Sequence, residues 1–261
     1  FEDGIAAVYA RGGIDSADTL TGSPYLYLPH EAVVPGPVQA WAIAPALGKY
    51  RPVTFDSVVG QPHITQTLKN AILSNHLAQA FLFTGPRGVG KTTTARILAK
   101  TINCTQVSKE LEACDKCDSC TSFNSGHSLN IYELDAASNN TVDDIRALVE
   151  QVRYAPQMGR YKVYIIDEVH MLSTAAFNAF LKTLEEPPPH AKFVFATTEI
   201  RKVPVTILSR CQRFDLRRVE SGVLVKHLES IAKKEGIGTE PEALALIARA
   251  AEGSVRDSLS L

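Results

Sequence analysis

Four apolar segments of strand length alternate with amphipathic segments through the middle of the chain. The apolar segments are residues 80–84, 130–134, 162–166 and 192–196. The segments with apolar positions at helical spacing are residues 92–102, 142–152 and 174–184. This alternation predicts an α/β fold in which helices cover both faces of a mostly parallel sheet.

After Arg218 the pattern becomes helical only. Val225, Leu228 and Ile231 lie at helical intervals within residues 222–235, and Pro241 is placed to begin a second helix that runs to residue 251. A third helix is predicted to start at residue 254. A small all-helical domain is therefore expected after the α/β domain.

The first 46 residues differ from the rest, because they are rich in glycine and proline and show no sustained helical period. They predict a loop-rich extension. The expected division is an N-terminal extension at 1–46, an α/β domain at 47–218 with a cysteine module at about 104–120, and a helical domain at 219–261. Since the chain begins with Phe1, its natural start is expected to be missing.

Composition narrows the class of protein. Hydrophobic residues make up 45% and charged residues 21% of the chain, with a mean hydropathy of −0.03. No segment approaches the roughly 20 apolar residues that cross a bilayer, so a soluble cytoplasmic protein with no membrane partner is expected. The net charge of −1 means that any contact with DNA would need a local basic patch or an assembly.

The most informative motif is Gly85-Pro-Arg-Gly-Val-Gly-Lys91-Thr92, which fits the phosphate loop G-x-x-x-x-G-K-[ST]. It follows a predicted strand and opens a predicted helix, the context in which backbone amides surround phosphates. We expect Lys91 to reach the β- and γ-phosphates and the Thr92 hydroxyl to bind Mg²⁺. The residues expected to bind the nucleotide here are Gly85, Pro86, Arg87, Gly88, Val89, Gly90, Lys91, Thr92 and Thr93.

An acidic pair, Asp167 and Glu168, follows the apolar run at 163–166. A carboxylate at the end of such a strand can hold Mg²⁺ through water, which is the role expected for Asp167. The adjacent Glu168 can polarise an attacking water as a general base. Together with the phosphate loop, this pair predicts a nucleotide hydrolase.

Four of the five cysteines lie close together in the sequence, at Cys104, Cys114, Cys117 and Cys120. Four thiolates at short spacing fit tetrahedral zinc, and four protein ligands would make the site structural. A redox role is the alternative. His127 is expected to be a loop residue rather than an extra ligand, and Cys211 a partly buried thiol.

Several polar residues have no role that spacing alone assigns. Thr197 and Thr198 fit a turn or a cap, while Arg210 and Arg256 fit surface positions as well as functional ones. His170, which follows the acidic pair, is expected to have a structural or supporting role.

Together these residues resemble one family. From Lys49 to Leu261 the chain closely resembles the gamma/tau subunits of the bacterial DNA polymerase III clamp loader, which are AAA+ ATPases. The matching stretches are the phosphate loop, the cysteine module and residues 49–52, 58–61, 134–138, 154–156, 163–172, 181–188, 196–198, 204–211 and 250–261.

The resemblance implies further roles. Thr198 would be sensor 1, Arg256 would be sensor 2, and Arg210 would be an arginine finger acting on ATP held by a neighbouring subunit. The residues implied to form part of the adenine pocket are Tyr50, Arg51, Pro52, Val58 and Val59.

The implied function is that of an ATPase subunit that uses ATP, Mg²⁺ and Zn²⁺ and loads the sliding clamp onto primed DNA, as part of a DNA-directed DNA polymerase holoenzyme. Its implied partners are other clamp-loader subunits, the sliding clamp and primer–template DNA. The end at Leu261 is expected to truncate the helical lid domain and to omit a C-terminal assembly domain. The alternatives are a non-hydrolysing structural subunit of the same assembly and another AAA+ DNA motor.

Overall fold

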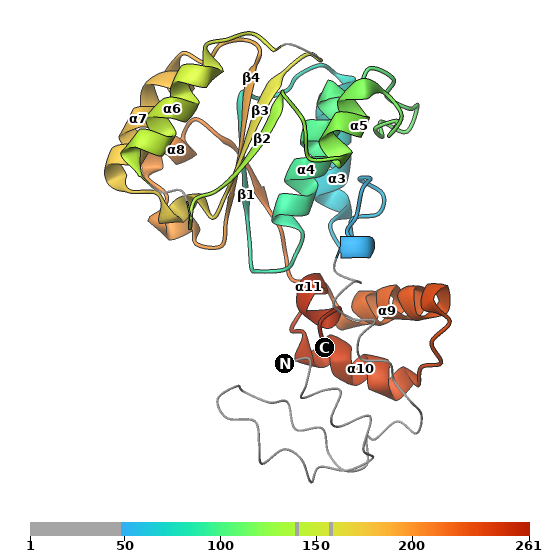
Figure 1. Ribbon diagram of the computed structural model, residues 1–261. Coiled ribbons are helices and arrows are strands. Elements are labelled where there is room, and N and C mark those ends of the chain that lie inside the picture. Colours follow the sequence, from blue (N-terminus) through green and yellow to red (C-terminus); the bar gives the residue numbers. More distant parts are fainter. Residues whose placement is uncertain (1–47, 139–140, 157–158) are drawn as a thin grey trace. The chain divides into compact units, whose positions relative to one another are not determined.

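The computed structural model describes residues 48–138, 141–156 and 159–261 (Figure 1). Residues 52–218 form one compact unit, and Val219–Leu261 belongs to a second unit that also includes residues 48–51. The extension predicted at 1–46 lies outside the described residues. The domain boundaries expected from the sequence stay predictions.

The first unit is built on a parallel sheet whose strands do not follow chain order. In the part of the chain that the structure describes, the sheet has five strands in the order β2-β3-β4-β1-β5. The strands are β1 (Ala80–Thr84), β2 (Ile131–Asp135), β3 (Lys162–Asp167), β4 (Ala191–Thr197) and β5 (Gln212–Asp215). The predicted α/β class and four of these strands are therefore confirmed.

Helices cover both faces of this sheet (Figure 1). On one face lie α3 (Pro62–Leu73), α4 (Lys91–Asn103) and α5 (Asp118–Asn124). On the other face lie α6 (Val142–Val152), α7 (Thr174–Glu185) and α8 (Val205–Leu208). Two single-turn 3₁₀ segments follow strand ends, η4 (Val169–Met171) and η5 (Ile200–Lys202). The three helices predicted between the strands, at 92–102, 142–152 and 174–184, are confirmed as α4, α6 and α7.

Alternate side chains along each buried strand pack into two separate hydrophobic cores, one on each face of the sheet. Phe81 and Phe83 of β1 join the core beneath α3 and α4, whereas Ala80 and Leu82 join the core beneath α6 and α7. Successive strand side chains point to opposite faces, so a strand covered on both sides is apolar throughout. All five residues of β1 are buried, as that rule requires.

Four helices or strands were not predicted from the sequence. Strand β5 buries only Phe214 of its four residues, because it pairs on one edge only, with β1, and its other side chains face outward. The short helices α5 and α8 and the longer helix α3 were also missed. Helix α3 begins with Pro62 in its first turn and buries Ile64 and Leu68.

The second unit is helical, as predicted. It contains α9 (Ser221–Glu235), which ends at Gly236 in the left-handed conformation, and α10 (Pro241–Ala250), which begins with proline at its first position. The third predicted helix is the short α11 (Val255–Ser258), capped by the Ser254 side chain. Among the described residues, none of the helices has the length and apolar character that crossing a bilayer requires.

Candidate nucleotide-binding site

The functional residues of the first unit gather where three neighbouring strands end. Strand β1 runs into the phosphate loop, β3 ends at Asp167, and β4 ends at Thr197. Because β4 lies between β3 and β1 in a parallel sheet, these three carboxyl ends meet at one edge. Ligands of open α/β sheets bind at this edge.

The phosphate loop has a conformation that glycine makes possible. Gly85 has a φ of 145°, and a Cβ added there would lie 2.3 Å from the Leu216 carbonyl oxygen. Gly90 has a φ of 105° and caps α4, which begins at Lys91. The first N–H groups of an α-helix have no intrahelical acceptor, so the start of α4 is suited to bind an anion.

Lys91 is buried inside this loop. Its ammonium donates hydrogen bonds to the carbonyl oxygens of Gly85, at 2.9 Å, and Pro86, at 2.7 Å. Burial lowers the pKa of Lys91, and the nearby carboxylates of Glu168 and Asp167 oppose that shift. The cation is thus held between the loop and the acidic end of β3.

Thr92 and Asp167 lie in direct contact although they are far apart in the sequence. The Thr92 hydroxyl donates to Asp167 Oδ2 at 2.5 Å. A hydroxyl and a carboxylate oxygen are the ligand types that Mg²⁺ uses beside phosphates. The structure therefore brings together the two side chains expected to hold the metal.

Glu168 lies directly after β3 in a left-handed backbone conformation, with a φ of 45°. Such a conformation is uncommon for a residue with a Cβ and often marks a functional position. Its Oε2 atom accepts hydrogen bonds from the Thr198 amide at 3.1 Å and from the Thr198 hydroxyl at 3.0 Å. The expected base and the expected sensor are thereby joined.

His170 lies behind Glu168 and is almost fully buried. Its Nδ1 atom lies 3.0 Å from the Thr197 hydroxyl and 3.3 Å from Glu168 Oε2, while its Nε2 atom faces Glu199 at 3.8 Å. The ring therefore supports the carboxylate and the end of β4 at once. This agrees with the supporting role expected for His170.

Arg210 lies just after α8 and does not touch the residues above through any contact found in the described part of the chain. Its guanidinium donates to the Thr206 carbonyl oxygen at 2.7 Å and pairs with Glu185 at 2.7 Å. Its side chain is 32% exposed. The guanidinium is therefore partly exposed and oriented by α7 and α8.

The other residues expected at the site divide between the two units. Val58 is half-buried and packs against the core that contains Val89, and its Cγ1 atom lies 3.9 Å from the position that a Cβ on Gly90 would occupy. Pro52 and Val59 belong to the same unit and are also half-buried. The residues that belong to the second unit are Tyr50, Arg51 and Arg256. The Tyr50 hydroxyl donates to the Glu235 carboxylate of α9.

The four clustered cysteines converge on a common point. All four Sγ atoms lie within 4.8 Å of one another, and those of Cys104 and Cys117 are 4.0 Å apart. A tetrahedral ion with Zn–S bonds of about 2.3 Å requires sulfur atoms roughly 3.8 Å apart. The donor set therefore fits a metal ion, and no residue other than these cysteines joins the group within the described ranges.

Backbone amides surround these sulfur atoms. Cys104 Sγ accepts from the Cys114 amide at 3.3 Å, and Cys114 Sγ accepts from the Cys117 amide at 3.3 Å. Burial raises the pKa of the Cys117 thiol, but hydrogen bonds with Thr105 and Cys120 outweigh this effect and lower the pKa to about 6. By contrast, burial raises the pKa of Cys211 to about 12. Within the cluster burial likewise raises the pKa values of Cys104 and Cys120, whereas backbone hydrogen bonds lower that of Cys114, so thiolate character is favoured at Cys114 and Cys117 only.

Comparisons with known families cover nearly all of the described chain. A family described as "DNA polymerase III, delta subunit" matches residues 60–220, and one described as "DNA polymerase III clamp loader subunit, ATPase lid domain" matches residues 223–261. The tau subunit of DNA polymerase III from Bacillus subtilis is 51% identical over 212 residues, and that from Escherichia coli is 52% identical over 213 residues. The chain belongs to the gamma/tau family of clamp-loader subunits.

These matches cover 81% and 82% of the chain but only 38% and 33% of the two tau relatives. The chain therefore spans between a third and two fifths of their length. A solved structure of Thermotoga maritima RuvB, a Holliday junction branch migration motor, superposes with a TM-score of 0.59 at 22% identity. It covers 80% of this chain and 63% of the RuvB chain. The gamma/tau chain thus has an AAA+ ATPase fold followed by a lid.

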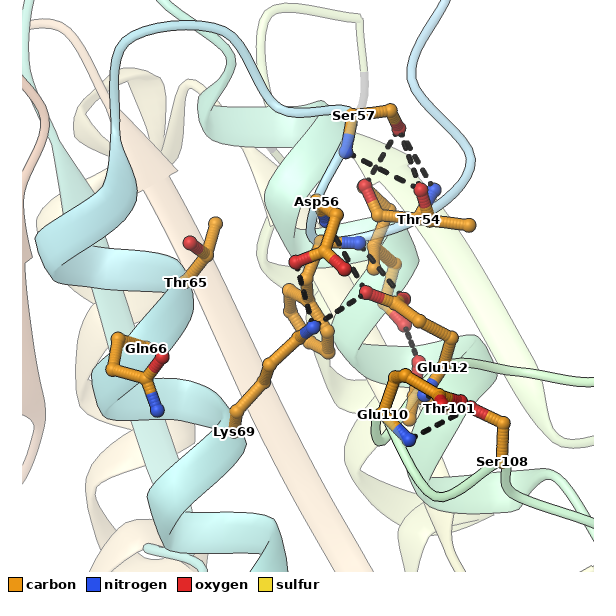
Figure 2. Close-up of polar contacts among 12 residues, drawn as sticks. Thr54, Asp56, Ser57, Thr65, Gln66, Lys69, Thr101, Ser108, Glu110 and Glu112 are labelled. Atoms are coloured by element: carbon orange, nitrogen blue, oxygen red, sulfur yellow. Dashed lines mark hydrogen bonds and ion pairs between the residues drawn. The ribbon is translucent and has the colours of Figure 1, made fainter.

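One group of charged residues was not singled out by the sequence. Lys69 of α3, Asp56 and Glu112 form a network of ion pairs between three separate segments (Figure 2). Nothing in the sequence signals it, because the three residues match no motif and are joined only by folding.

Proposed function

We propose that this chain is the ATP-binding and ATP-hydrolysing part of a clamp-loader subunit. In this proposal, ATP binding by several such subunits opens the sliding clamp and places it on primed DNA, and hydrolysis releases clamp and DNA. The partners are other clamp-loader subunits, the clamp and primer–template DNA, in the cytoplasm. Family membership and the AAA+ fold support this proposal.

The observation that carries the proposal is the contact between Thr92 and Asp167 beside the buried Lys91. Mg²⁺ held by Thr92 and, through water, by Asp167 would neutralise charge on the β- and γ-phosphates of ATP. Lys91 would donate to the same phosphates in place of its present carbonyl partners. The amides of residues 85–93 would complete the phosphate cradle.

Glu168 is the proposed general base. Its Oε2 atom is held by Thr198, so the carboxylate has a defined direction before it meets a water molecule. Thr198, as sensor 1, would then contact the γ-phosphate or the attacking water. His170 would keep the carboxylate in place from the buried side.

Three further roles complete the proposal. Arg210 would stabilise the transition-state charge on ATP bound by a neighbouring subunit, and Arg256 would contact the phosphates from the lid as sensor 2. The residues proposed to form part of the adenine pocket are Tyr50, Arg51, Pro52, Val58 and Val59.

The test of nucleotide binding is Lys91→Met in the full-length protein. The variant removes a buried cation that donates to the phosphates, so affinity for a non-hydrolysable ATP analogue should fall roughly 10- to 100-fold. Lys202→Met, which removes an exposed lysine paired with Glu199, should bind within about twofold of wild type. A wild-type protein that binds no ATP would instead support the non-hydrolysing structural subunit.

The cysteine cluster is proposed to hold a structural Zn²⁺. The full-length protein should contain about one zinc ion per chain by elemental mass spectrometry, and Cys120→Ser should lose it together with thermal stability. Cys211→Ser is the matched control and should retain the metal, since Cys211 lies outside the cluster. Full zinc content in Cys120→Ser would contradict the proposal.

A further inference from the structure

Glu112 joins the cysteine module to the segment that precedes α3. It lies two residues before Cys114, and its carboxylate reaches back to two successive backbone amides (Figure 2). Glu112 Oε2 accepts from the Phe55 amide at 2.9 Å, and Oε1 accepts from the Asp56 amide at 3.2 Å. Because the Glu112 side chain is only 12% exposed, water is a poor substitute for these contacts.

Lys69 of α3 completes this link. Its ammonium lies 2.9 Å from Glu112 Oε1 and 2.7 Å from Asp56 Oδ1, and its side chain is 11% exposed. Loss of the Glu112 charge would leave the nearly buried Lys69 paired only with the exposed carboxylate of Asp56. The network therefore locks the cysteine module, α3 and residues 54–58 together.

Residues 54–58 form a tight turn that depends on this support. The Ser57 amide donates to the Thr54 carbonyl oxygen at 3.2 Å, and the Val58 amide donates to the Phe55 carbonyl oxygen at 3.2 Å. Phe55 is buried in the same core as Phe83 and Val89. The turn is thus fixed by the core on one side and by Glu112 on the other.

The turn ends at Val58, which packs against the core that contains Val89 of the phosphate loop, and its Cγ1 atom lies 3.9 Å from where a Cβ on Gly90 would be. Gly90 caps the helix whose first amides face the proposed phosphates. A shift of the turn would therefore move Val58 relative to the phosphate loop. A displacement of the cysteine module would therefore reach the proposed nucleotide site through a chain of contacts formed by Glu112, the turn and Val58.

We propose that Glu112 is a positioning residue through which the metal-loaded cysteine module sets the affinity for nucleotide. The inference rests on the proposed function, since it presumes that ATP binds beside Val58 and Gly90. The Glu112 backbone is itself tied to the module, because its carbonyl accepts from the Ser108 amide at 2.9 Å. A metal at Cys104 and Cys114 closes the loop that carries both residues.

The experiment measures the affinity of the full-length protein for a fluorescent, non-hydrolysable ATP analogue, together with zinc content. Glu112→Gln keeps the size of the side chain but removes the ion pair with Lys69 and one acceptor. Its Kd should rise about 3- to 10-fold at full zinc content, well below the unfolding temperature. Glu110→Gln, an exposed position on the same loop, should bind like wild type.

Equal Kd values for Glu112→Gln and Glu110→Gln would overturn the inference. If Glu112→Gln does not fold, Lys69→Gln removes the same ion pair from the side of α3 and should raise the Kd by the same 3- to 10-fold. A Kd of Lys69→Gln equal to that of wild type would then overturn the inference. Loss of binding in Lys91→Met with normal binding in Glu112→Gln would refute this inference alone. A wild-type protein that binds no nucleotide would instead refute the proposed function.

Zinc removal tests the direction of the coupling. Chelation of the wild-type protein should raise the Kd by about the same 3- to 10-fold, and chelation of Glu112→Gln should add little, because the link is already broken. If chelation raised the Kd of Glu112→Gln by the same factor as that of wild type, the two changes would act independently, and this result would contradict the inference.

Discussion

Replacing Glu168 with glutamine is expected to lower ATP hydrolysis by about 10²- to 10⁴-fold while nucleotide affinity changes little. Glutamine has the shape of glutamate and can still accept from the Thr198 amide and hydroxyl, which now bond Oε2. It cannot take a proton from water. The variant should therefore bind ATP and remain in the ATP-bound form, measured by turnover and equilibrium binding of the full-length subunit within its assembly.

The matched control is Glu199→Gln. Glu199 also faces His170, but at 3.8 Å and with half of its side chain exposed, and it pairs with Lys202. Hydrolysis by this control should stay within about twofold of wild type, since exposed pairs contribute little. If Glu168→Gln hydrolysed ATP within tenfold of wild type, Glu168 would not be the base.

Replacing Arg210 with alanine is expected to lower the ATPase rate of the assembled subunits by about 10³- to 10⁵-fold. The guanidinium is oriented by Thr206 and Glu185 and is partly exposed, as a group that acts on a neighbour must be. The isolated subunit should keep its own slow rate, because it holds no second guanidinium from a partner. Rates of the isolated and assembled protein, with clamp and primed DNA, test this.

Two controls separate a finger acting between subunits from loss of structure. Arg213→Ala removes an exposed arginine that pairs with Asp215, and the assembly should keep its activity. In mixed assemblies, Lys91→Met subunits still carry Arg210 and should restore hydrolysis at the sites of Arg210→Ala subunits. Full activity of an assembly made only of Arg210→Ala subunits would exclude the finger.

Much of the fold follows from local patterning. Buried strands such as β1 and β4 are apolar over most of their length, and α6 and α7 show helical spacing with capping residues, so each can be recognised from a short window. Strand β5 could not be predicted in this way. Its Gln212 and Arg213 are polar and exposed, and it is a strand because β1 offers an unpaired edge.

The sequence alone determined those parts of the site that lie within a few residues of one another. The phosphate loop and the cysteine spacing are of this kind, because glycine conformations, helix starts and short metal loops are local. Only the tertiary structure decided which distant groups meet. Thr92 contacts Asp167 and Glu168 contacts Thr198 because the strand order places β4 between β1 and β3. Glu112 meets Phe55 and Lys69 only through packing, which no local pattern encodes.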